Sequence, residues 1–326
     1  TYAFYQECYE RYCRLFRFKP QLVVSDLHPS YLSSSFAGKL AGEHPEIKLM
    51  SVQHHHAHIA SGMLDAGLDG EVVGFSFDGI GLGSDGHMWG AEVMKANYGN
   101  FERLCHFEYM PLPGGDKASK EPWRMAISYL YHCFGEELYE LKLPLNQKFS
   151  RQESGNIVNL IQKKINTPLV SSAGRLFDAV AAIIGLNYYS TYQAEAPMLL
   201  ESALDPNEQG NYNFGLEAGQ VSFVPLIREL VEDIHSGKSP GCMAAKFHRS
   251  LVLLILHLSL EIREESGLDR IVLGGGTFQN RYLSEKVMDK LENEGFKVYL
   301  PRRIPVNDQG IAAGQLAIGA YRRKFT

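Results

Sequence analysis

The chain has 326 residues, of which 45% are apolar and 21% charged, as in an ordinary soluble globular protein with room for two compact lobes. Its 32 basic and 37 acidic residues give a net charge of −5, which argues against a nucleic-acid partner because protein surfaces that bind nucleic acids are basic. The longest apolar run, Leu251 to Leu256, is too short to span a bilayer, so we expect no membrane partner.

Five cysteines stand at positions 8, 13, 105, 133 and 242, without any C-x-x-C pair. This pattern predicts neither a disulfide framework nor a zinc ribbon, and it fits a reducing cytoplasm. We expect Cys8 and Cys13 to be buried small residues on a first helix. The chain begins with Thr1 rather than Met, and a helix starts at once, so we expect a part of a longer protein.

The first third of the chain predicts helices and short strands in alternation. Its opening, Tyr2 to Phe16, is amphipathic, with Phe4, Cys8, Tyr12 and Leu15 on one face. Apolar runs then predict strands at 21–25, 47–52 and 72–77, with helices over 30–40 and from residue 54. The glycine-rich segment 78–86 is expected to be a loop, followed by antiparallel strands over 87–93 and 100–109.

The remainder predicts a helical insertion and then more strands and helices. Residues 111–170 form the insertion, in which Pro122 suits the first turn of a helix reaching about Cys133. Ser239 and Pro240 predict the start of a long helix that ends near Gly267. Further strands are expected at 270–273 and 297–300, each followed by a helix. The alternation predicts an α/β fold with a largely parallel sheet and helices on both sides.

Four of the twelve histidines lie within the segment Val52 to His58. If a helix begins here, His54 and His58 share one face at i, i+4 spacing, which lets two imidazoles hold one metal ion. No Glu follows the first histidine, so a zincin protease is not indicated. The alternative is a polar surface tract, but a position directly after a buried strand favours metal binding.

Two histidines do not complete a metal site, and parallel sheets deliver further residues from the carboxyl ends of their strands. Asp78 follows the strand at 72–77, and Asp308 follows the strand at 297–300 and begins a helix. Each also has an ordinary explanation, an Asp-Gly turn for Asp78 and a helix N-cap for Asp308. A shell of two nitrogens and two oxygens would suit iron or zinc, and magnesium poorly.

Two glycine-containing turns indicate a bound anion or nucleotide. Gly274–Gly276 follows a strand and precedes a helix, where the backbone and the helix N-terminus can approach a phosphate. It is neither a Walker A motif nor a full G-x-G-x-x-G, and alone it is a weak signal. Gly174 opens another apolar helix, in which Asp178 could hold a ribose hydroxyl. The alternative for Asp178 is a first-turn carboxylate favoured by the helix dipole.

The segment Pro113 to Arg124 combines flexible backbone with basic side chains. Lys117, Lys120 and Arg124 could clamp a phosphate or carbamoyl group. A solvated basic loop is the ordinary alternative and is favoured for the two lysines.

These segments, in this order, resemble the C-terminal transferase part of HypF carbamoyltransferases over nearly the whole chain. The matching segments are residues 25–31, 52–58, 78–86 with 89–92, 112–116 with 121–124, 174–178, 274–280 and 307–310. The same core is similar to the threonylcarbamoyl-transferase that modifies tRNA and to carbamoyltransferases of antibiotic synthesis.

The resemblance implies a two-lobed actin/hexokinase-like nucleotide-binding fold. Its first lobe would cover 1–110, its helical insertion 111–170 and its nucleotide-binding lobe 171–326. No phosphate-loop hairpin precedes Gln21, so the first-lobe sheet is expected to be incomplete. The implied divalent metal, iron or zinc, would be held by His54, His58 and Asp308, with Asp78 nearby or bound, and magnesium would accompany the nucleotide. We expect Asp78 and Arg124 to be catalytic. The adenosine would lie against Gly174, Asp178, Gly274, Gly275, Gly276 and Asn280.

The implied activity is carbamoyl transfer from carbamoyl-adenylate, itself derived from ATP, to the thiol of the C-terminal cysteine of HypE. Later dehydration would yield the nitrile that becomes the cyanide ligand of nickel–iron hydrogenase. HypF proteins carry acylphosphatase, zinc-finger and YrdC-like modules before this part, and none is expected in this sequence. The adenylate-forming step is therefore not expected here. The alternatives are an ATP-dependent small-molecule kinase of the same fold, which would not need the histidine cluster, and a non-catalytic scaffold.

Overall fold

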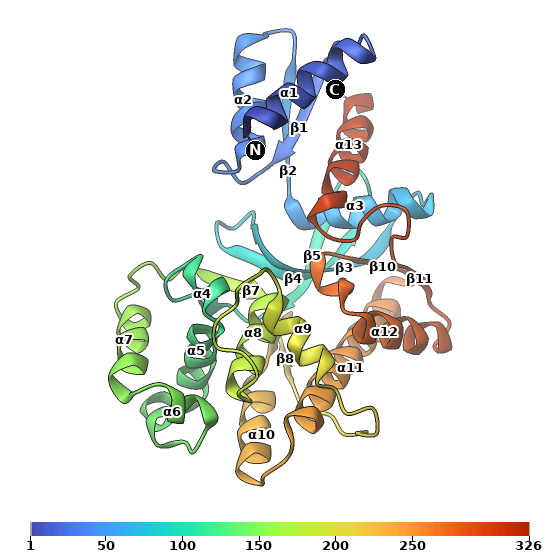
Figure 1. The fold of residues 1–326 in the computed structure, drawn as a ribbon. Helices are drawn as coiled ribbons and strands as arrows, with labels where there is room; N and C mark the ends of the chain where they lie inside the picture. The colour runs from blue at the N-terminus through green and yellow to red at the C-terminus, as the bar shows by residue number, and fades with distance from the viewer. Residues whose placement is uncertain (1, 326) are drawn as a thin grey trace.

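The computed structural model describes residues 2–325, which form a small upper part and a larger body (Figure 1). The upper part has a two-stranded parallel sheet of β1 (Leu22–Asp26) and β2 (Lys48–Val52). Helices α1 (Tyr2–Leu15) and α2 (Leu32–Glu43) flank it, and both chain ends lie there. The strands are in register, with Asp26 opposite Val52, so both carboxyl ends open toward the body.

The body is built on a mixed sheet in the order β11-β10-β3-β4-β5-β9-β8, with β7 also pairing with β4 and β6 pairing with β7. Its longer strands are β3 (Val72–Leu82), β4 (Met88–Ala96), β5 (Phe101–Phe107) and β10 (Arg270–Gly274). The short ones are β6 (Met110–Pro111), β7 (Leu169–Ser172), β8 (Gly215–Glu217), β9 (Gln220–Ser222) and β11 (Lys297–Tyr299). β3, β10 and β11 run parallel, whereas β4 is antiparallel to β3 and β5.

Helices cover the sheet and fill the region expected to be a helical insertion. Those of the insertion are α4 (Lys117–Lys120), α5 (Pro122–Phe134), α6 (Pro144–Lys148) and α7 (Arg151–Gln162), with a 3₁₀ turn at Gly135–Glu140. The others are α3 (His54–Ala66), α8 (Ala173–Ile183), α9 (Glu195–Ser202), α10 (Val224–His235), α11 (Pro240–Ser266), α12 (Arg281–Asn293) and α13 (Ile311–Arg322). Further 3₁₀ turns span Gly276–Gln279, Asp308–Gly310 and Arg323–Phe325.

The predicted long helix is α11, which begins at Pro240 behind the capping hydroxyl of Ser239 and ends at Gly267. Its length and apolar composition would suffice to cross a membrane, but 67% of that stretch is buried inside the protein. Leu251, Leu254 and Ile255 are fully buried in the main apolar core. α11 therefore has the burial expected of a core helix.

The face of α1 that packs against the protein differs from the predicted one. The predicted helix is confirmed, but Phe4, Tyr12 and Leu15 are 67%, 60% and 72% exposed. Cys8 and Cys13 are only partly buried, so their expected burial was wrong. The helix instead surrounds the ring of Phe36 on α2 with three tyrosines. They are Tyr2, Tyr5 and Tyr9. Both stripes have helical spacing, so the pattern alone does not choose between them.

The predicted strand at 72–77 is longer in the structure, where β3 continues to Leu82. Its pairing with β4 is irregular between Phe77 and Gly81, and the glycine-rich segment forms the outer half of this hairpin. The predicted loop is thus shorter than residues 78–86. Strands before residue 110 and strands after residue 170 belong to the same sheet, so the sheet does not mark the expected lobe boundaries at these positions. The boundaries remain a prediction.

Candidate metal and nucleotide site

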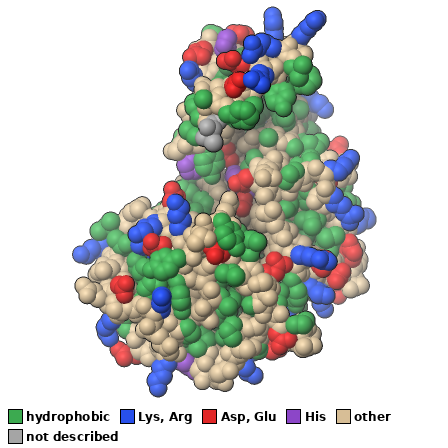
Figure 2. Space-filling model, in the orientation of Figure 1, with side chains coloured by type: hydrophobic (Ala, Val, Ile, Leu, Met, Phe, Trp, Pro, Cys, Tyr) green, Lys and Arg blue, Asp and Glu red, His purple; other side chains and the backbone are tan. Residues whose placement is uncertain are grey.

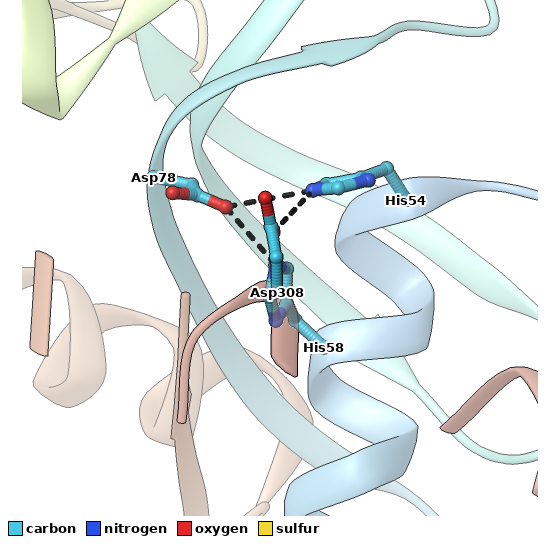
Figure 3. Close-up of side chains that lie close together, drawn as sticks. All are labelled: His54, His58, Asp78 and Asp308. Atoms are coloured by element: carbon cyan, nitrogen blue, oxygen red, sulfur yellow. Dashed lines mark hydrogen bonds and ion pairs between the residues drawn. The ribbon is translucent and has the colours of Figure 1, made fainter. Parts of the chain in front are cut away.

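Four side chains from three separate segments converge at the junction of the upper part and the body (Figure 3). They are His54 and His58 of α3, Asp78 of β3 and Asp308 of the turn before α13. His58 Nε2 lies 3.0 Å from Asp78 Oδ2 and 3.3 Å from Asp308 Oδ1. His54 Nε2 lies 3.4 Å and 3.3 Å from the same two oxygens. Histidine and acidic side chains are visible at this narrow waist in Figure 2.

The local structure of α3 explains why its two histidines face one point. Gln53 caps the helix by accepting the backbone N–H of His56, so the helix begins at His54, as predicted. One helical turn then places His54 and His58 on the same side. Their side chains are 4% and 1% exposed, whereas that of Asp308 is 64% exposed. The cluster is therefore closed on the α3 side and open to solvent on the Asp308 side.

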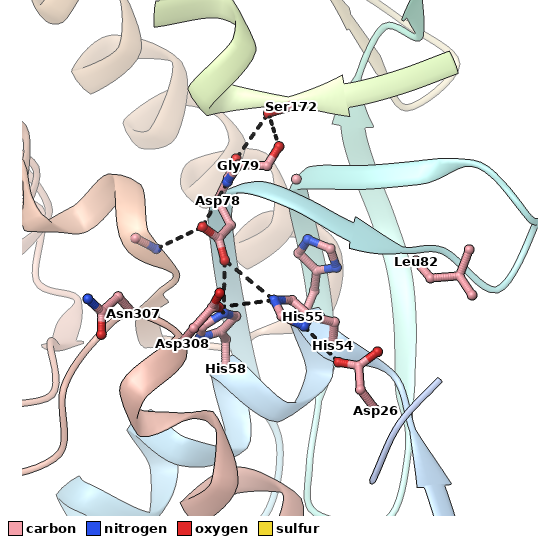
Figure 4. A network of polar contacts seen from close by, with 12 residues as sticks. Asp26, His54, His55, His58, Asp78, Gly79, Leu82, Ser172, Asn307 and Asp308 are labelled. Carbon is pink, nitrogen blue, oxygen red and sulfur yellow. Dashed lines mark hydrogen bonds and ion pairs between the residues drawn. The ribbon is translucent and has the colours of Figure 1, made fainter. Parts of the chain in front are cut away.

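His54 is oriented by Asp26, which sequence reasoning missed. Asp26 Oδ2 accepts from His54 Nδ1 at 2.7 Å, which turns Nε2 toward Asp78 and Asp308 (Figure 4). The contact follows from strand register, because Asp26 pairs with Val52 and α3 begins two residues later. A carboxylate behind a histidine is the usual support of a metal ligand. Asp26 could have been found as Asp78 was, because both follow a short apolar run that predicts a strand.

Asp78 is held in place by one backbone donor of its own strand and one from the turn that follows the parallel strand β10. Its Oδ1 accepts the N–H of Gly79 at 2.7 Å and the N–H of Gly276 at 3.4 Å. Gly276 is close because Gly274 of β10 pairs with Ser76 of β3. The other oxygen, Oδ2, is left facing the two histidines. Asp78 and Gly79 lie inside β3, so the Asp-Gly turn that was the alternative for Asp78 is not formed.

The side chain of Asp308 does not act as a helix N-cap, which was the alternative to a site role for this residue. The side chain of Asn307 caps this turn instead, accepting the backbone N–H of Gln309 at 3.2 Å. The Asp308 carboxylate therefore points into the cluster rather than back onto its own helix.

The charges in the cluster stabilise one another. Burial lowers the pKa of His54, but the surrounding carboxylates outweigh it and hold that pKa well above its ordinary value. The pKa of His58 is raised by the same balance. Burial raises the pKa of Asp78, but hydrogen bonds from the two histidines hold it well below its ordinary value. Hydrogen bonds from the histidines also lower the pKa of Asp308.

The spacing of the four ligand atoms fits a small tetrahedral cation. Bonds of about 2.0–2.1 Å, typical of zinc with nitrogen and oxygen ligands, give a tetrahedron with edges of about 3.3–3.4 Å. The four nitrogen–oxygen separations of 3.0–3.4 Å are close to this value. All four ligand atoms lie within 4.8 Å of one another. Two imidazoles and two carboxylates suit zinc or iron better than magnesium.

The stability of the metal-free protein should fall as the pH rises through the raised pKa values of His54 and His58. Their protonated rings pair with carboxylates in the fold, so this contribution is complete below their unfolded pKa of about 6.5 and disappears above the folded pKa. Metal binding needs neutral rings, so added Zn²⁺ should stabilise the protein increasingly over the same range. Urea unfolding from pH 6 to 9, with and without Zn²⁺, measures both trends. Parallel curves would contradict a shared site.

The other two histidines of the tract do not join the cluster, although both are buried. His55 Nδ1 contacts the Gln53 amide at 3.0 Å, and burial holds the pKa of its ring well below the ordinary value. His56 Nε2 contacts the backbone oxygen of Asn97 at 2.7 Å, and burial lowers its pKa to about 4. These neutral rings help fix the helix that presents the other pair.

The glycines predicted to approach a nucleotide lie beside the cluster. At Gly275, with φ of +93°, a Cβ atom would come within 2.3 Å of the backbone oxygen of Phe77. At Gly174, a Cβ would lie 3.2 Å from the Cα of Gly79, and Ser172 donates to the backbone oxygens of Asp78 and Gly79. Two turns therefore pack closely on the Phe77–Gly79 backbone, and a side chain at Gly275 would collide with it.

The other two predicted nucleotide-binding residues, Asp178 and Asn280, both have side-chain partners within the protein. Asp178 is 2% exposed, its Oδ2 forms an ion pair with Arg175 Nη2 at 2.9 Å, and burial raises its pKa to about 6 despite that partner. It lies in the middle of α8, so its first-turn explanation was wrong. Asn280 caps α12 by accepting from Leu283 N–H, and its amide contacts His248 Nε2 at 2.9 Å. Asp178 is thus paired with an arginine of the same helix, and Asn280 has a structural role as a helix cap.

Arg124, predicted to be catalytic, is paired within its own segment. Its Nε donates to Glu121, its guanidinium lies 5.4 Å from the Trp123 ring centroid, and it approaches Gly114. It does not belong to the four-residue cluster. Its catalytic role remains a prediction.

Asp65 is a second residue that sequence reasoning missed, and it holds the segment leading to Asp308. Its carboxylate accepts the backbone N–H groups of Arg302, Arg303 and Ile304 at 2.9, 3.1 and 3.1 Å. Asp65 belongs to α3, so the helix that carries both histidines also anchors the approach of the third segment. No sequence signal marks it, because its partners are backbone groups in an irregular stretch.

Replacing Asp65 by alanine should lower metal affinity by about 10- to 100-fold, as loss of groups that position ligands does. The histidines stay in place, but the segment carrying Asp308 loses three hydrogen bonds. Competition with a chromophoric chelator measures the affinity. Asp69→Ala is the control, since exposed Asp69 bonds only Gly70 N–H among the described backbone donors. Equal affinities in both variants would mean that Asp65 does not position Asp308.

Comparison with known proteins identifies the family of this chain. Residues 74–315 match the family model described as "Carbamoyltransferase, Kae1-like Domain, second subdomain", and residues 1–65 match the "HypF Kae1-like domain". The chain is 34% identical to carbamoyltransferase HypF2 of Cupriavidus necator over 95% of its length and 41% of that protein's. It is 32% identical to HypF of Synechocystis over its full length and 43% of the relative's. A threonylcarbamoyltransferase of Thermosipho melanesiensis is 25% identical over 47% of the chain.

Solved structures show the same relation. A full-length HypF in the phosphate- and nucleotide-bound form is similar over 98% of this chain and 50% of its own, with 38% identity and a TM-score of 0.91. HypF of T. kodakarensis gives 31% identity and a TM-score of 0.89, over 99% of this chain and 43% of its own. The chain thus spans about half the length or less of these relatives. The predicted fold class and family resemblance are confirmed, and the chain belongs to the HypF carbamoyltransferase family, whose Kae1-like domain it matches.

Proposed function

We propose that this domain transfers a carbamoyl group from carbamoyl-adenylate to the thiol of the C-terminal cysteine of HypE, in the cytoplasm, during nickel–iron hydrogenase maturation. The observation that carries the proposal is the convergence of His54, His58, Asp78 and Asp308 beside two glycine turns. The five cysteines here are free, which suits a reducing compartment and leaves the acceptor thiol to the partner.

In this proposal His54, His58, Asp78 and Asp308 hold one zinc or iron ion, with magnesium accompanying the nucleotide. A bound cation supplies positive charge to the phosphate of the adenylate and so makes AMP a better leaving group. Asp26 keeps His54 Nε2 turned inward, and the N–H groups of Gly79 and Gly276 keep one oxygen of Asp78 occupied.

The glycine turns provide the place for the nucleotide. Gly174 and Gly274–Gly276 let the backbone approach the phosphate and sugar. Asp178, a buried carboxylate paired with Arg175, would accept a hydrogen bond from a ribose hydroxyl. The thiolate of HypE attacks the carbamoyl carbon, a carbon–sulfur bond forms, and the carbon–oxygen bond to phosphate breaks to release AMP. Arg124 could assist the transfer only if its ion pair with Glu121 opened, so the proposed mechanism does not depend on Arg124.

The test combines this protein, carbamoyl-adenylate supplied by a YrdC-like module with ATP and carbamoyl phosphate, and HypE. We expect HypE to gain the mass of one carbamoyl group, and HypE without its terminal cysteine to gain none. Phosphorylation of a small molecule by ATP, without carbamoylation, would instead support a kinase. Absence of both bound metal and nucleotide would support a scaffold.

A further inference from the structure

The segment between β1 and α2 lies next to the four-residue cluster and is tied to it. Asp26 Oδ1 accepts the backbone N–H of His28 at 2.8 Å, while its Oδ2 contacts His54 Nδ1. One carboxylate therefore fixes both a predicted metal ligand and the start of this segment. The segment ends at Tyr31, the residue immediately before α2.

The ring of Tyr31 has a defined orientation. It stacks on the ring of His28, with centroids 4.4 Å apart and planes 10° from parallel. His28 Nδ1 accepts the backbone N–H of Ser30 at 3.3 Å, which sets the plane of the imidazole. The Tyr31 ring is thus held by stacking on His28, whose backbone N–H donates to Asp26.

The phenol of Tyr31 lies near the charged groups of the cluster. Burial raises the pKa of Tyr31, and the charges of His54, Asp26, Asp308 and Asp78 act on it, so its proton is retained at neutral pH. Among residues 2–325 the hydroxyl has no hydrogen-bond partner. A partly buried donor without a partner, close to charged groups, is positioned for a ligand.

We propose that Tyr31 is the hydrogen-bond donor that the upper part contributes to a phosphate oxygen of the nucleotide bound at the cluster. The inference rests on the proposed function, which places that phosphate there. The nearest backbone donors of the body, Gly79 and Gly276, already bond Asp78. Phosphate oxygens facing the upper part therefore need another donor, and a neutral hydroxyl provides one without adding charge.

The test is titration calorimetry of the full chain with one equivalent of Zn²⁺, using AMP and adenosine as probes. Tyr31→Phe keeps the stack and removes only the hydroxyl. It should weaken AMP binding by about 10- to 100-fold, as loss of a hydrogen bond to a charged group does, and leave adenosine binding unchanged. Tyr12→Phe is the matched control, because Tyr12 is exposed on α1, and it should bind both probes like the unmodified protein.

The possible outcomes separate this inference from the proposed function. Unchanged AMP affinity in Tyr31→Phe, while the unmodified protein binds AMP, would overturn the role of Tyr31 alone. Equal weakening of AMP and adenosine, or loss of Zn²⁺, would show a structural role and also overturn it. Failure of the unmodified protein to bind either probe would overturn the proposed nucleotide site, and the inference with it.

Discussion

Replacing His58 by alanine should abolish metal binding and carbamoyl transfer together. His58 is almost fully buried, and its Nε2 lies 3.0 Å from Asp78 and 3.3 Å from Asp308. Alanine leaves three ligand atoms where a tetrahedral cation needs four. Loss of groups that only orient a ligand weakens metal binding by about 10- to 100-fold, so loss of a ligand should exceed about 100-fold. Elemental analysis after dialysis and the mass of HypE measure the two effects.

A second variant separates metal binding from folding, because His58→Ala also removes a buried partner of Asp78. Asp308→Asn changes a 64% exposed side chain by one atom, so the protein should fold normally and still lose most of its metal. His257→Ala is the control: this exposed histidine of α11 contacts Glu261 at 3.2 Å, and its removal should change neither readout. Full metal content and full transfer in both His58→Ala and Asp308→Asn would refute the assignment of the site.

The parts of this site that could be predicted are those that depend on regular structure. Helical spacing alone brings His54 and His58 to one side of α3, and no knowledge of the rest of the fold is needed. Parallel strands end at one edge of a sheet, which is why Asp78 was predicted as a ligand at the end of its apolar run. In the structure Asp78 Oδ1 lies 3.4 Å from the N–H nitrogen of Gly276, just after the parallel strand β10. Asp26 obeys the same rule at the end of β1.

The parts that could not be predicted depend on irregular segments or on a choice between equivalent patterns. Asp308 was predicted as a ligand, but the role of Asp65 in holding the stretch before it was not, because backbone donors carry no sequence signature. The two aromatic stripes of α1 have the same spacing, so only packing on Phe36 decides which is covered. Glycines 79 and 81 were read as a loop, whereas pairing with β4 extends the strand.

Replacing Gly314 by alanine should destabilise the protein and weaken metal binding, although Gly314 touches no ligand. Helix α13 crosses α3 so closely that a Cβ at Gly314 would lie 1.8 Å from the backbone oxygen of Ala57 and 2.8 Å from Ser61 N. Backbone atoms cannot rotate away, so the two helices must separate. Because α3 carries both histidines and α13 follows Asp308 directly, separation moves the ligands apart. Overpacking of this kind costs about 3 kcal/mol.

Gly38→Ala is the matched control, because Gly38 lies inside α2 with no atom within 4 Å of a built Cβ. There alanine should stabilise the protein by up to about 1 kcal/mol through helix propensity and leave metal affinity unchanged. Urea unfolding and chelator competition on both variants give the comparison. A Gly314→Ala protein with unaltered stability and metal affinity would mean that α13 does not pack directly on α3. The position of Asp308 in the cluster would then lose its structural basis, since the contact between these helices is what holds the third segment against the two histidines.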